Sequence, residues 1–595
     1  MDTLTERPPL ELEREVLAWT EAVYDEAELE LSESHEIKIT AKIIDYICSR
    51  QWSKKVRGGR SRPIINKTFR HFMEMVGLLT DLELKFDVKF TDTVEGHSEL
   101  ELLLNRMITD WAFDTDFEME LSMAVMYGII HTGPVKIQWN SELLDGLGDN
   151  EFQVLSPLNY MRIGDGNKIE NSEVIIYRRP VTVQYLQRRY GSLADGITPD
   201  IMSSQMPATS LRPPGVANST WNRLSPALRN LMGIRKQGTQ SRFPQTMLKE
   251  YWLKDSSVWH GKESIVVGNP LANWAYIVEP GMALYPRGRV IITAGNKVLE
   301  DSCNPYWHGR PPFAEYRAFQ VPWNFKHGAS VMEPLVAMQY VLNRINGGVM
   351  DTVLSAITPG VMGPKGAFSQ QEWDTLDPSE LGGKFAYNNN AARPPELTKS
   401  RELPAYVETF EQRVEREMDQ TSGASAISQA MSKKQVPGGD SLDMIFSSRS
   451  IPMRFMSRGL KTFLNQCGRM VTANLLQFAT AERRVAKYGA SGIVANDLVP
   501  YYKSFLPKGM EPEEFVRKAN FTIRRGSLLS IEKSEKIQFA FALRKQHDLS
   551  RHMLLEFLDA NIDIQKNDEQ LKQEMAEKAA IAQAAGALGA AHKKH

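Results

Sequence analysis

Cysteine is scarce in this 595-residue chain: only Cys48, Cys303 and Cys467 occur, and they lie far apart. This spacing excludes a Cys-x-x-Cys site and a disulfide framework, and it favours a reducing compartment. No run of 18 apolar residues is present, so we expect no membrane span. The first residues, MDTLTERPPLELERE, are acidic and polar, which predicts no signal peptide.

An excess of charge of one sign is also missing. Lys and Arg total 71, Asp and Glu total 72, and the formal net charge is -1. Proteins that grip nucleic acid tightly usually have a basic surplus. The balance therefore argues against a high-affinity nucleic-acid binder, but it is compatible with a protein past which nucleic acid slides.

The familiar catalytic patterns do not occur. The segment SKKQVPGGDS places its lysines before its glycines and follows a helical pattern, so it does not fit a phosphate-binding loop. HExxH is absent, and YGASGI lacks the second glycine of a nucleophile elbow. Asp110, Asp114 and Asp116 are carboxylates of the type that bind metal, but a solvated helix face is the simpler interpretation. We expect no catalytic residue, cofactor or metal.

Hydrophobic periodicity predicts an α+β chain that is mainly α. Residues 1–130 have mostly helical spacing, whereas VKIQWN, FQVLSPLNYMRI and EVIIYRRPV after Val135 indicate strands. Residues 192–245 are rich in Ser, Pro, Gly and Arg, which predicts an insertion or mobile loop. Strands are expected again up to about residue 325.

The next part of the chain is predicted to run out and back. Apolar residues recur every three or four positions from about Ser330 to Ala356, which predicts a long helix weakened by Gly347-Gly348. Residues 357–401 are punctuated by Pro and Gly, with a strand-like GKFAY, and a second helix is expected at 403–420. After the segment Ser422 to Met444, a long helical region over 441–487 is expected to be interrupted at Pro452 and Gly459. The last 55 residues are predicted to be helical.

One turn is strongly basic. Between Arg50 and Pro63 six cationic residues occur in thirteen positions, with Trp52 among them. Such a turn suits phosphate contacts, but salt bridges at a subunit interface or a solvated surface explain it equally well. The six residues are Arg50, Lys54, Lys55, Arg57, Arg60 and Arg62.

The order of these segments resembles the portal (head–tail connector) proteins of tailed bacteriophages. WAFDTDFEMELSMAVMYGIIHTGPVKIQW is similar to the family's helix before a glycine turn and strand, and FQVLSPLNYMRIGDG to its P-x-N strand. LYPRGRVIITAGNKVLEDSCNPYWHGRPPFAEYRA resembles the strand pair before the stem, and HGASVMEPLVAMQYVLNRING the start of the first stem helix. FTIRRGSLLSIEKSEKIQFAFALRKQHDLSRHMLLEFLD resembles the C-terminal helical segment. Their order over roughly residues 100–560 supports the resemblance.

The resemblance implies a subunit with wing, stem, clip and crown regions in a ring, typically of twelve copies, at one capsid vertex. By position, the regions are wing 1–328 (with the insertion 192–245), first stem helix 329–356, clip 357–402, second stem helix 403–421, tunnel loop 422–440, wing 441–535 with a long kinked helix, and crown 536–595.

The resemblance also implies partners and contacts. Double-stranded DNA would pass non-specifically, with Lys433, Lys434 and Gln435 of the tunnel loop facing it. Acidic residues of the second stem helix, Glu408, Glu411 and Glu415, are candidates to line the channel, since dense phosphate contacts would stall DNA.

The large terminase subunit, which has the ATPase, would dock on the clip. Further partners would be the major capsid or scaffolding protein and a neck or tail adaptor, with no membrane. The protein would be assembled in the host cytoplasm and reside in the virion. Two alternatives stay open: another phage structural protein (minor capsid or tail adaptor), and a DNA-processing enzyme.

Overall fold

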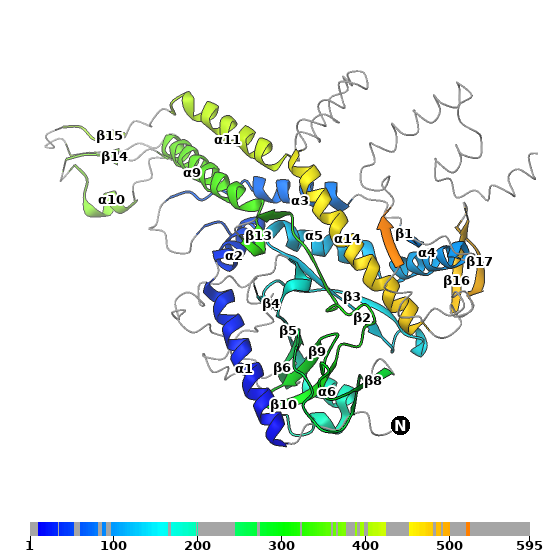
Figure 1. The fold of residues 1–595 in the computed structure, drawn as a ribbon. Helices are drawn as coiled ribbons and strands as arrows, with labels where there is room; N and C mark the ends of the chain where they lie inside the picture. Colours follow the sequence, from blue (N-terminus) through cyan, green and yellow to red (C-terminus); the bar gives the residue numbers. More distant parts are fainter. Residues whose placement is uncertain are drawn as a thin grey trace, which may run out of the picture. The chain divides into compact units, whose positions relative to one another are not determined.

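The fold is described from a computed structural model (Figure 1). It describes residues 10–33, 35–52, 60–80, 86–90, 97–164, 168–197, 199, 244–269, 274–321, 324–358, 361–364, 367–375, 387–388, 393–397, 403–423, 451–479, 483–489, 492–499 and 519–523. The chain divides into two compact units, each built from separate stretches of sequence. Unit 1 comprises Met1–Asp81, Glu118–Ile137 and Phe152–Phe463, and unit 2 comprises Leu82–Phe117, Gln138–Glu151 and Leu464–His595.

Helices dominate the first 130 residues, as the periodicity predicts. In the third helix, residues spaced by three or four, such as Thr68, Phe72, Met75 and Leu79, form one buried face. A short strand, β1, was not expected here, and its partner, β18, lies more than 400 residues later. The helices are α1 Leu10–Glu33, α2 His35–Ile47, α3 Lys67–Thr80, α4 His97–Asp114 and α5 Phe117–Ile130; the strands are β1 Phe86–Phe90 and β18 Ala519–Ile523.

A five-stranded antiparallel sheet forms the centre of unit 1, in the order β10-β9-β6-β5-β4. Its longest pairing joins β5 to β6 over nine residues, from Val174↔Leu253 to Thr182↔Gln245. Thr182 also caps the helix α6 (Val183–Tyr190), because its side chain accepts a hydrogen bond from the Tyr185 N–H. The strands are β4 Tyr160–Ile163, β5 Val174–Thr182, β6 Gln245–Leu253, β9 Arg289–Ala294 and β10 Lys297–Cys303.

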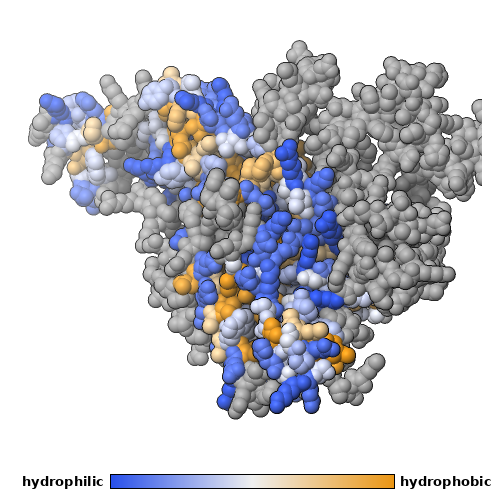
Figure 2. All heavy atoms as spheres, in the orientation of Figure 1, coloured by the Kyte–Doolittle hydropathy of each residue, from blue (hydrophilic) through white to orange (hydrophobic). Residues whose placement is uncertain are grey.

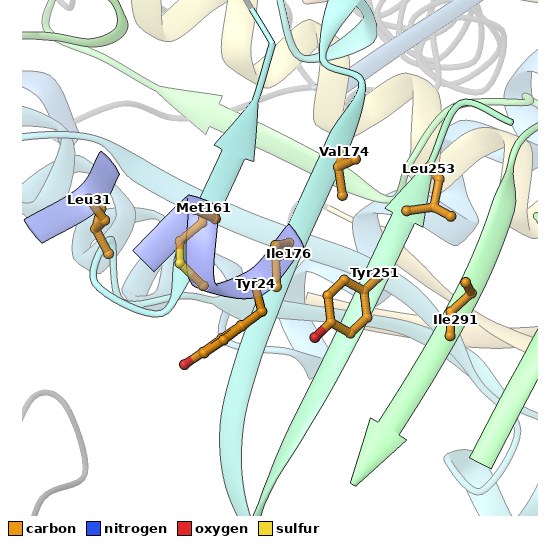
Figure 3. Packing of buried hydrophobic residues seen from close by; sticks show 9 residues of the cluster. Tyr24, Leu31, Met161, Val174, Ile176, Tyr251, Leu253 and Ile291 are labelled. Atoms are coloured by element: carbon orange, nitrogen blue, oxygen red, sulfur yellow. The ribbon is translucent and has the colours of Figure 1, made fainter. Parts of the chain in front are cut away.

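Helix α1 covers one face of this sheet. Figure 3 shows Tyr24 and Leu31 of the helix against strand side chains such as Met161, Ile176 and Tyr251, all of them buried. Burying each side chain of this size contributes about 1.5–3 kcal/mol. Glu28 of the helix is buried as well, and the Arg178 guanidinium on β5 lies 3.0 Å from its carboxylate, so the charge is paired.

A second sheet has the order β11-β2-β3, with β2 Gly133–Asn140, β3 Asp149–Val154 and β11 Phe313–Tyr316. Lys136 of β2 and Glu250 of β6 form a buried ion pair at 2.6 Å, which ties the two sheets of unit 1 together. Two-stranded hairpins complete the strands: β7 Ile265–Asn269 with β8 Trp274–Val278, β12 Phe319–Val321 with β13 Asn324–Ala329, and β16 Arg483–Gly489 with β17 Gly492–Val499.

The predicted helix over 441–487 is corrected in two respects. Helix α14 runs without a break from Ile451 to Phe478, through both Pro452 and Gly459, and residues 483–487 belong to the strand β16 instead. Pro452 lies in the first turn, where a missing N–H costs no hydrogen bond. At Gly459 a Cβ would lie 3.0 Å from the Arg317 carbonyl oxygen, so this glycine permits close packing rather than ending the helix.

The mixture of helices and strands agrees with the α+β class. Most of the insertion predicted at 192–245, the helices predicted at 536–595 and most of GKFAY lie outside the described residues. Among the described helices, none is at once long and apolar enough to cross a membrane.

Candidate functional site: a two-helix hairpin

The predicted out-and-back segment is present in unit 1. Helix α9 (Met332–Ile357) leads out, and α11 (Tyr406–Ser422) returns against it (Figure 1). At 1.5 Å per residue the 26 residues of α9 span roughly 39 Å. Between the helices lie β14 (Val361–Met362), α10 (Gln370–Thr375) and β15 (Glu396–Leu397), and the pairing of β14 with β15 brings the chain back. We call α9, α11 and this tip the hairpin.

Burial changes along the hairpin. The buried residues of α9 all lie between Met332 and Gly347, in its first two thirds, and those of α11 are Met418 and Ser422 in its last turns. These two stretches form the root of the hairpin, where α2 and α3 also pack. Beyond the root, neither helix buries a residue, so the distal hairpin projects from the rest of unit 1.

The distal hairpin is nevertheless rich in exposed apolar side chains. Ile357 is 62% exposed at the end of α9, and Tyr406 is 72% exposed at the start of α11. Figure 2 shows hydrophobic side chains among hydrophilic ones over these helices. A helix that leaves apolar side chains in water usually meets a partner there. The further members are Tyr340, Met350, Val353, Leu354, Met362, Trp373, Leu397, Leu403 and Phe410.

The basic turn is attached to α9. Asp351 Oδ1 accepts a hydrogen bond from the Ser61 N–H at 2.7 Å. One turn earlier in the helix, a Cβ at Gly347 would lie 3.2 Å from the Ser61 carbonyl oxygen. The glycine pair therefore does not break α9. Its first member lets the turn approach the helix closely.

The cationic residues of this turn are placed only in part. Arg50 pairs with Asp45 at 3.1 Å, and Arg60 and Arg62 are exposed. Arg60 lies close enough to Asp351 to help lower the pKa of that carboxyl, after the hydrogen bond from Ser61. The other three predicted residues, Lys54, Lys55 and Arg57, lie outside the described residues.

A buried network of neutral amides joins α9 to the start of α3. Gln339 Oε1 accepts hydrogen bonds from the backbone N–H groups of Lys67 at 2.9 Å and Thr68 at 3.1 Å, two donors that have no partner within their own helix. Gln339 Nε2 donates to the Ile65 carbonyl and to Asn343 Oδ1, both at 2.9 Å. Asn343 in turn donates to Gln51.

Helix α11 meets α3 through charged and titratable groups instead. Lys67 Nζ lies 3.0 Å from Glu415 Oε1. One turn further, the buried His71 ring has Nε2 3.6 Å from Asp419 Oδ1 and Nδ1 3.1 Å from Ser422 Oγ. Burial lowers the pKa of His71, although Asp419 and Glu74 act in the opposite direction.

The acidic candidates therefore differ in their surroundings. Glu408 is exposed and Glu411 is half-buried, whereas Glu415 is engaged with Lys67 of α3. Helix α11 ends at Gly423 in a left-handed conformation with φ 66°, which only glycine adopts without strain. The tunnel-loop candidates Lys433, Lys434 and Gln435 lie outside the described residues.

The metal-type carboxylates of α4 do not come together with further ligands. Asp114 and Asp116 are exposed, which agrees with a solvated face, and Asp110 is half-buried. Within the part of the chain that is described, no group of three or more His, Cys, Asp or Glu residues is placed to hold a metal ion.

Sequence reasoning missed Gln339 and His71. A signal for Gln339 existed, because it lies at helical spacing between the buried Leu335 and Leu342, where an apolar residue would be expected. His71 has the same kind of position beside Phe72 and Met75. The sequence matches no protein-family model, and no curated protein matches it.

Proposed function

We propose that the chain is the subunit of a ring-shaped channel at a capsid vertex, a portal protein of a tailed bacteriophage, through which double-stranded DNA is packaged and ejected. The observation that supports this most is the hairpin: its root is buried in unit 1, and its distal part exposes apolar side chains. In a ring, the neighbouring copy covers these side chains through repeated head-to-tail contacts.

The charge distribution supports a conduit rather than a tight DNA grip. The whole chain is near neutral, and Glu408, Glu411 and Glu417 give α11 exposed or half-exposed acidic groups. Tight phosphate contacts would be multiplied by the number of subunits, because each phosphate contact adds to affinity. In this proposal Glu408 and Glu411 line the channel, while Lys433 and Lys434 contact passing phosphates transiently.

The tip of the hairpin suits a docking role. Met362 and Leu397 at the ends of the β14–β15 pair and Trp373 of α10 are all exposed. In a ring these side chains would form an apolar collar at one end of the stem. We propose that the terminase, and later the neck or tail adaptor, dock on it, while other surfaces contact the major capsid or scaffolding protein.

The test is electron microscopy of the purified protein in negative stain, together with its native mass. We expect rings with a central hole, near twelve subunits. Ile357→Glu should keep the monomer folded and abolish the rings, because the charge recurs at every interface. The matched control is Ile277→Glu on β8, since Ile277 is as exposed as Ile357, at 65% against 62%, but lies outside the hairpin.

Two results would overturn the proposal. One is a compact, stable dimer at every concentration, which would favour a DNA-processing enzyme. The other is an equal effect of the two substitutions on assembly, because the hairpin would then have no special part in it. Open or irregular assemblies without a central hole would point to another structural protein of the virion.

A further inference from the structure

The two helices of the hairpin are held at the root in different ways, and α3 lies between the two modes of attachment. It contacts both α9 and α11. Toward α9 its partners are the neutral side chains Gln339 and Asn343. Toward α11 its partners are the ions and titratable groups around Lys67 and His71. One side of α3 is therefore insensitive to protons and salt, and the other is not.

The centre of the sensitive side is His71. Its side chain is 3% exposed, and carboxylates of two helices approach its two ring nitrogens: Asp419 of α11 lies 3.6 Å from Nε2, and Glu74 of α3 lies 3.7 Å from Nδ1. Ser422 Oγ lies 3.1 Å from Nδ1 and also donates to the Asp419 carbonyl at 3.2 Å. The ring thus fills the space between α3 and the last turn of α11.

The other charged groups near the ring are accounted for. On its own helix these are Lys67 and Arg70, whose positive charges lower the pKa of His71, and Glu74, which raises it. From α11, Asp419 raises it. Glu415 of α11 pairs with Lys67. Helix α9 meets α3 through neutral amides. Burial outweighs the attraction of the two carboxylates, so the neutral ring is favoured while α11 is docked.

We propose that His71 is a proton-operated latch that holds the end of α11 on α3 and releases it when the ring takes up a proton, while α9 stays fixed. The proposal concerns the folded chain itself and does not depend on ring formation.

The sign follows from linkage. An imidazole freed from α3 has its ordinary pKa of about 6.5, whereas the docked ring has a lower pKa. Between these two values the undocked state binds the proton and the docked state does not. Docking is therefore fully favourable above about pH 6.5 and weakens as the pH falls through that value toward the pKa of the docked ring.

The consequence at the end of α11 is local. Ser422 is followed at once by Gly423, whose left-handed conformation ends the helix. Release of the last turn frees the base of the segment that contains Lys433 and Lys434. If the chain forms a DNA channel, the latch then controls how far these lysines reach.

The experiment is hydrogen–deuterium exchange of the full chain at about pH 7.5 and about pH 5.5, corrected for the intrinsic rate at each pH. Peptides of α11 should lose about tenfold in protection at the lower pH, which corresponds to about one pKa unit, while peptides of α9 change little. His71→Gln keeps a hydrogen-bonding side chain that cannot be protonated in this range, and should remove the response. His308→Gln, a histidine of unit 1 away from the hairpin, should leave it intact.

A second variant keeps the test decisive should His71→Gln fold poorly. Asp419→Asn removes a carboxylate that stabilises the protonated ring, so release should occur at a lower pH than in the parent chain. The proposal is overturned when α9 and α11 lose protection in parallel, when α11 does not respond to pH, or when His71→Gln retains the response of the parent chain. None of these results bears on whether rings form, so the two proposals fail independently.

Discussion

Asp351 and Ser61 are 290 positions apart, yet the aspartate Oδ1 accepts a hydrogen bond from the serine backbone N–H at 2.7 Å. This bond fastens the basic turn to the part of α9 that projects from the root. The turn is therefore part of the hairpin's surface, although nothing in its own sequence predicts the neighbour. Its cationic residues and the exposed apolar residues of α9 belong to one face of unit 1.

Loss of this attachment should expose the basic turn to proteases. We expect Asp351→Ala to accelerate cleavage by trypsin after Arg60 and Arg62, because the backbone at Ser61 loses its acceptor. Asp351→Asn keeps an acceptor oxygen and should lie between the two. Time courses of limited proteolysis, with cleavage sites identified by mass spectrometry, measure the difference. Equal rates for all three proteins would mean that the hydrogen bond does not hold the turn.

The adjacent glycines of α9 should respond to alanine in opposite ways. At Gly348 a Cβ meets nothing within 4 Å, so Gly348→Ala should stabilise the protein by about 1 kcal/mol through helix propensity. At Gly347 the Cβ would lie 3.2 Å from the Ser61 carbonyl oxygen, and the clash should cancel that gain. Urea unfolding of the two variants makes the comparison with each as the other's control. Equal stabilisation by both would show that the turn yields freely.

The buried pair of Lys136 and Glu250 should make unit 1 sensitive to acid. Burial raises the pKa of Glu250, but Lys136, followed by Arg179 and Arg189, lowers it by more, so it lies below the ordinary 4.5. The pair's contribution is thus fully present above about pH 4.5 and is lost as the pH falls through the lower pKa of the folded state. Glu250→Gln leaves the Lys136 ammonium buried and unpaired, which should cost about 3–5 kcal/mol at neutral pH and flatten the loss of stability in acid.

Urea unfolding at a series of pH values checks this prediction. The control is Asp45→Asn, which breaks the more exposed pair with Arg50 and should change stability by less than about 1 kcal/mol. Similar losses for the two variants would contradict a special role for burial.

Local periodicity predicted much of the fold. The helical spacing of α9 and the strand patterns of β2, β5 and β6 depend on neighbouring residues, and all are present. The pairing of β1 with β18 and the strands β16 and β17 were missed, because their partners or patterns are not encoded locally. Pro452 and Gly459 were wrongly expected to interrupt α14, since a proline in the first turn and a glycine under a carbonyl oxygen are both compatible with a helix.

The candidate site was predicted in outline only. Acidic residues such as Glu408 were identified from composition, but the attachment of α11 to α3 depends on His71 and Ser422, which are 351 positions apart. A single polar residue in an apolar helical stripe gives no indication of its partner. The cap that Gln339 supplies to Lys67 and Thr68 could not be inferred for the same reason.

The packing of α1 on the five-stranded sheet also has a consequence for synthesis. Helix α1 ends at Glu33, whereas the last strand that it contacts, β10, ends at Cys303. At about 5–20 residues per second, the ribosome needs on the order of tens of seconds to make the intervening chain. Throughout that delay Tyr24 and Leu31 have no sheet to cover, and the Glu28 carboxylate has no Arg178 until β5 emerges. The nascent chain must therefore remain soluble with this helix face exposed, which makes it a substrate for chaperones that bind apolar segments.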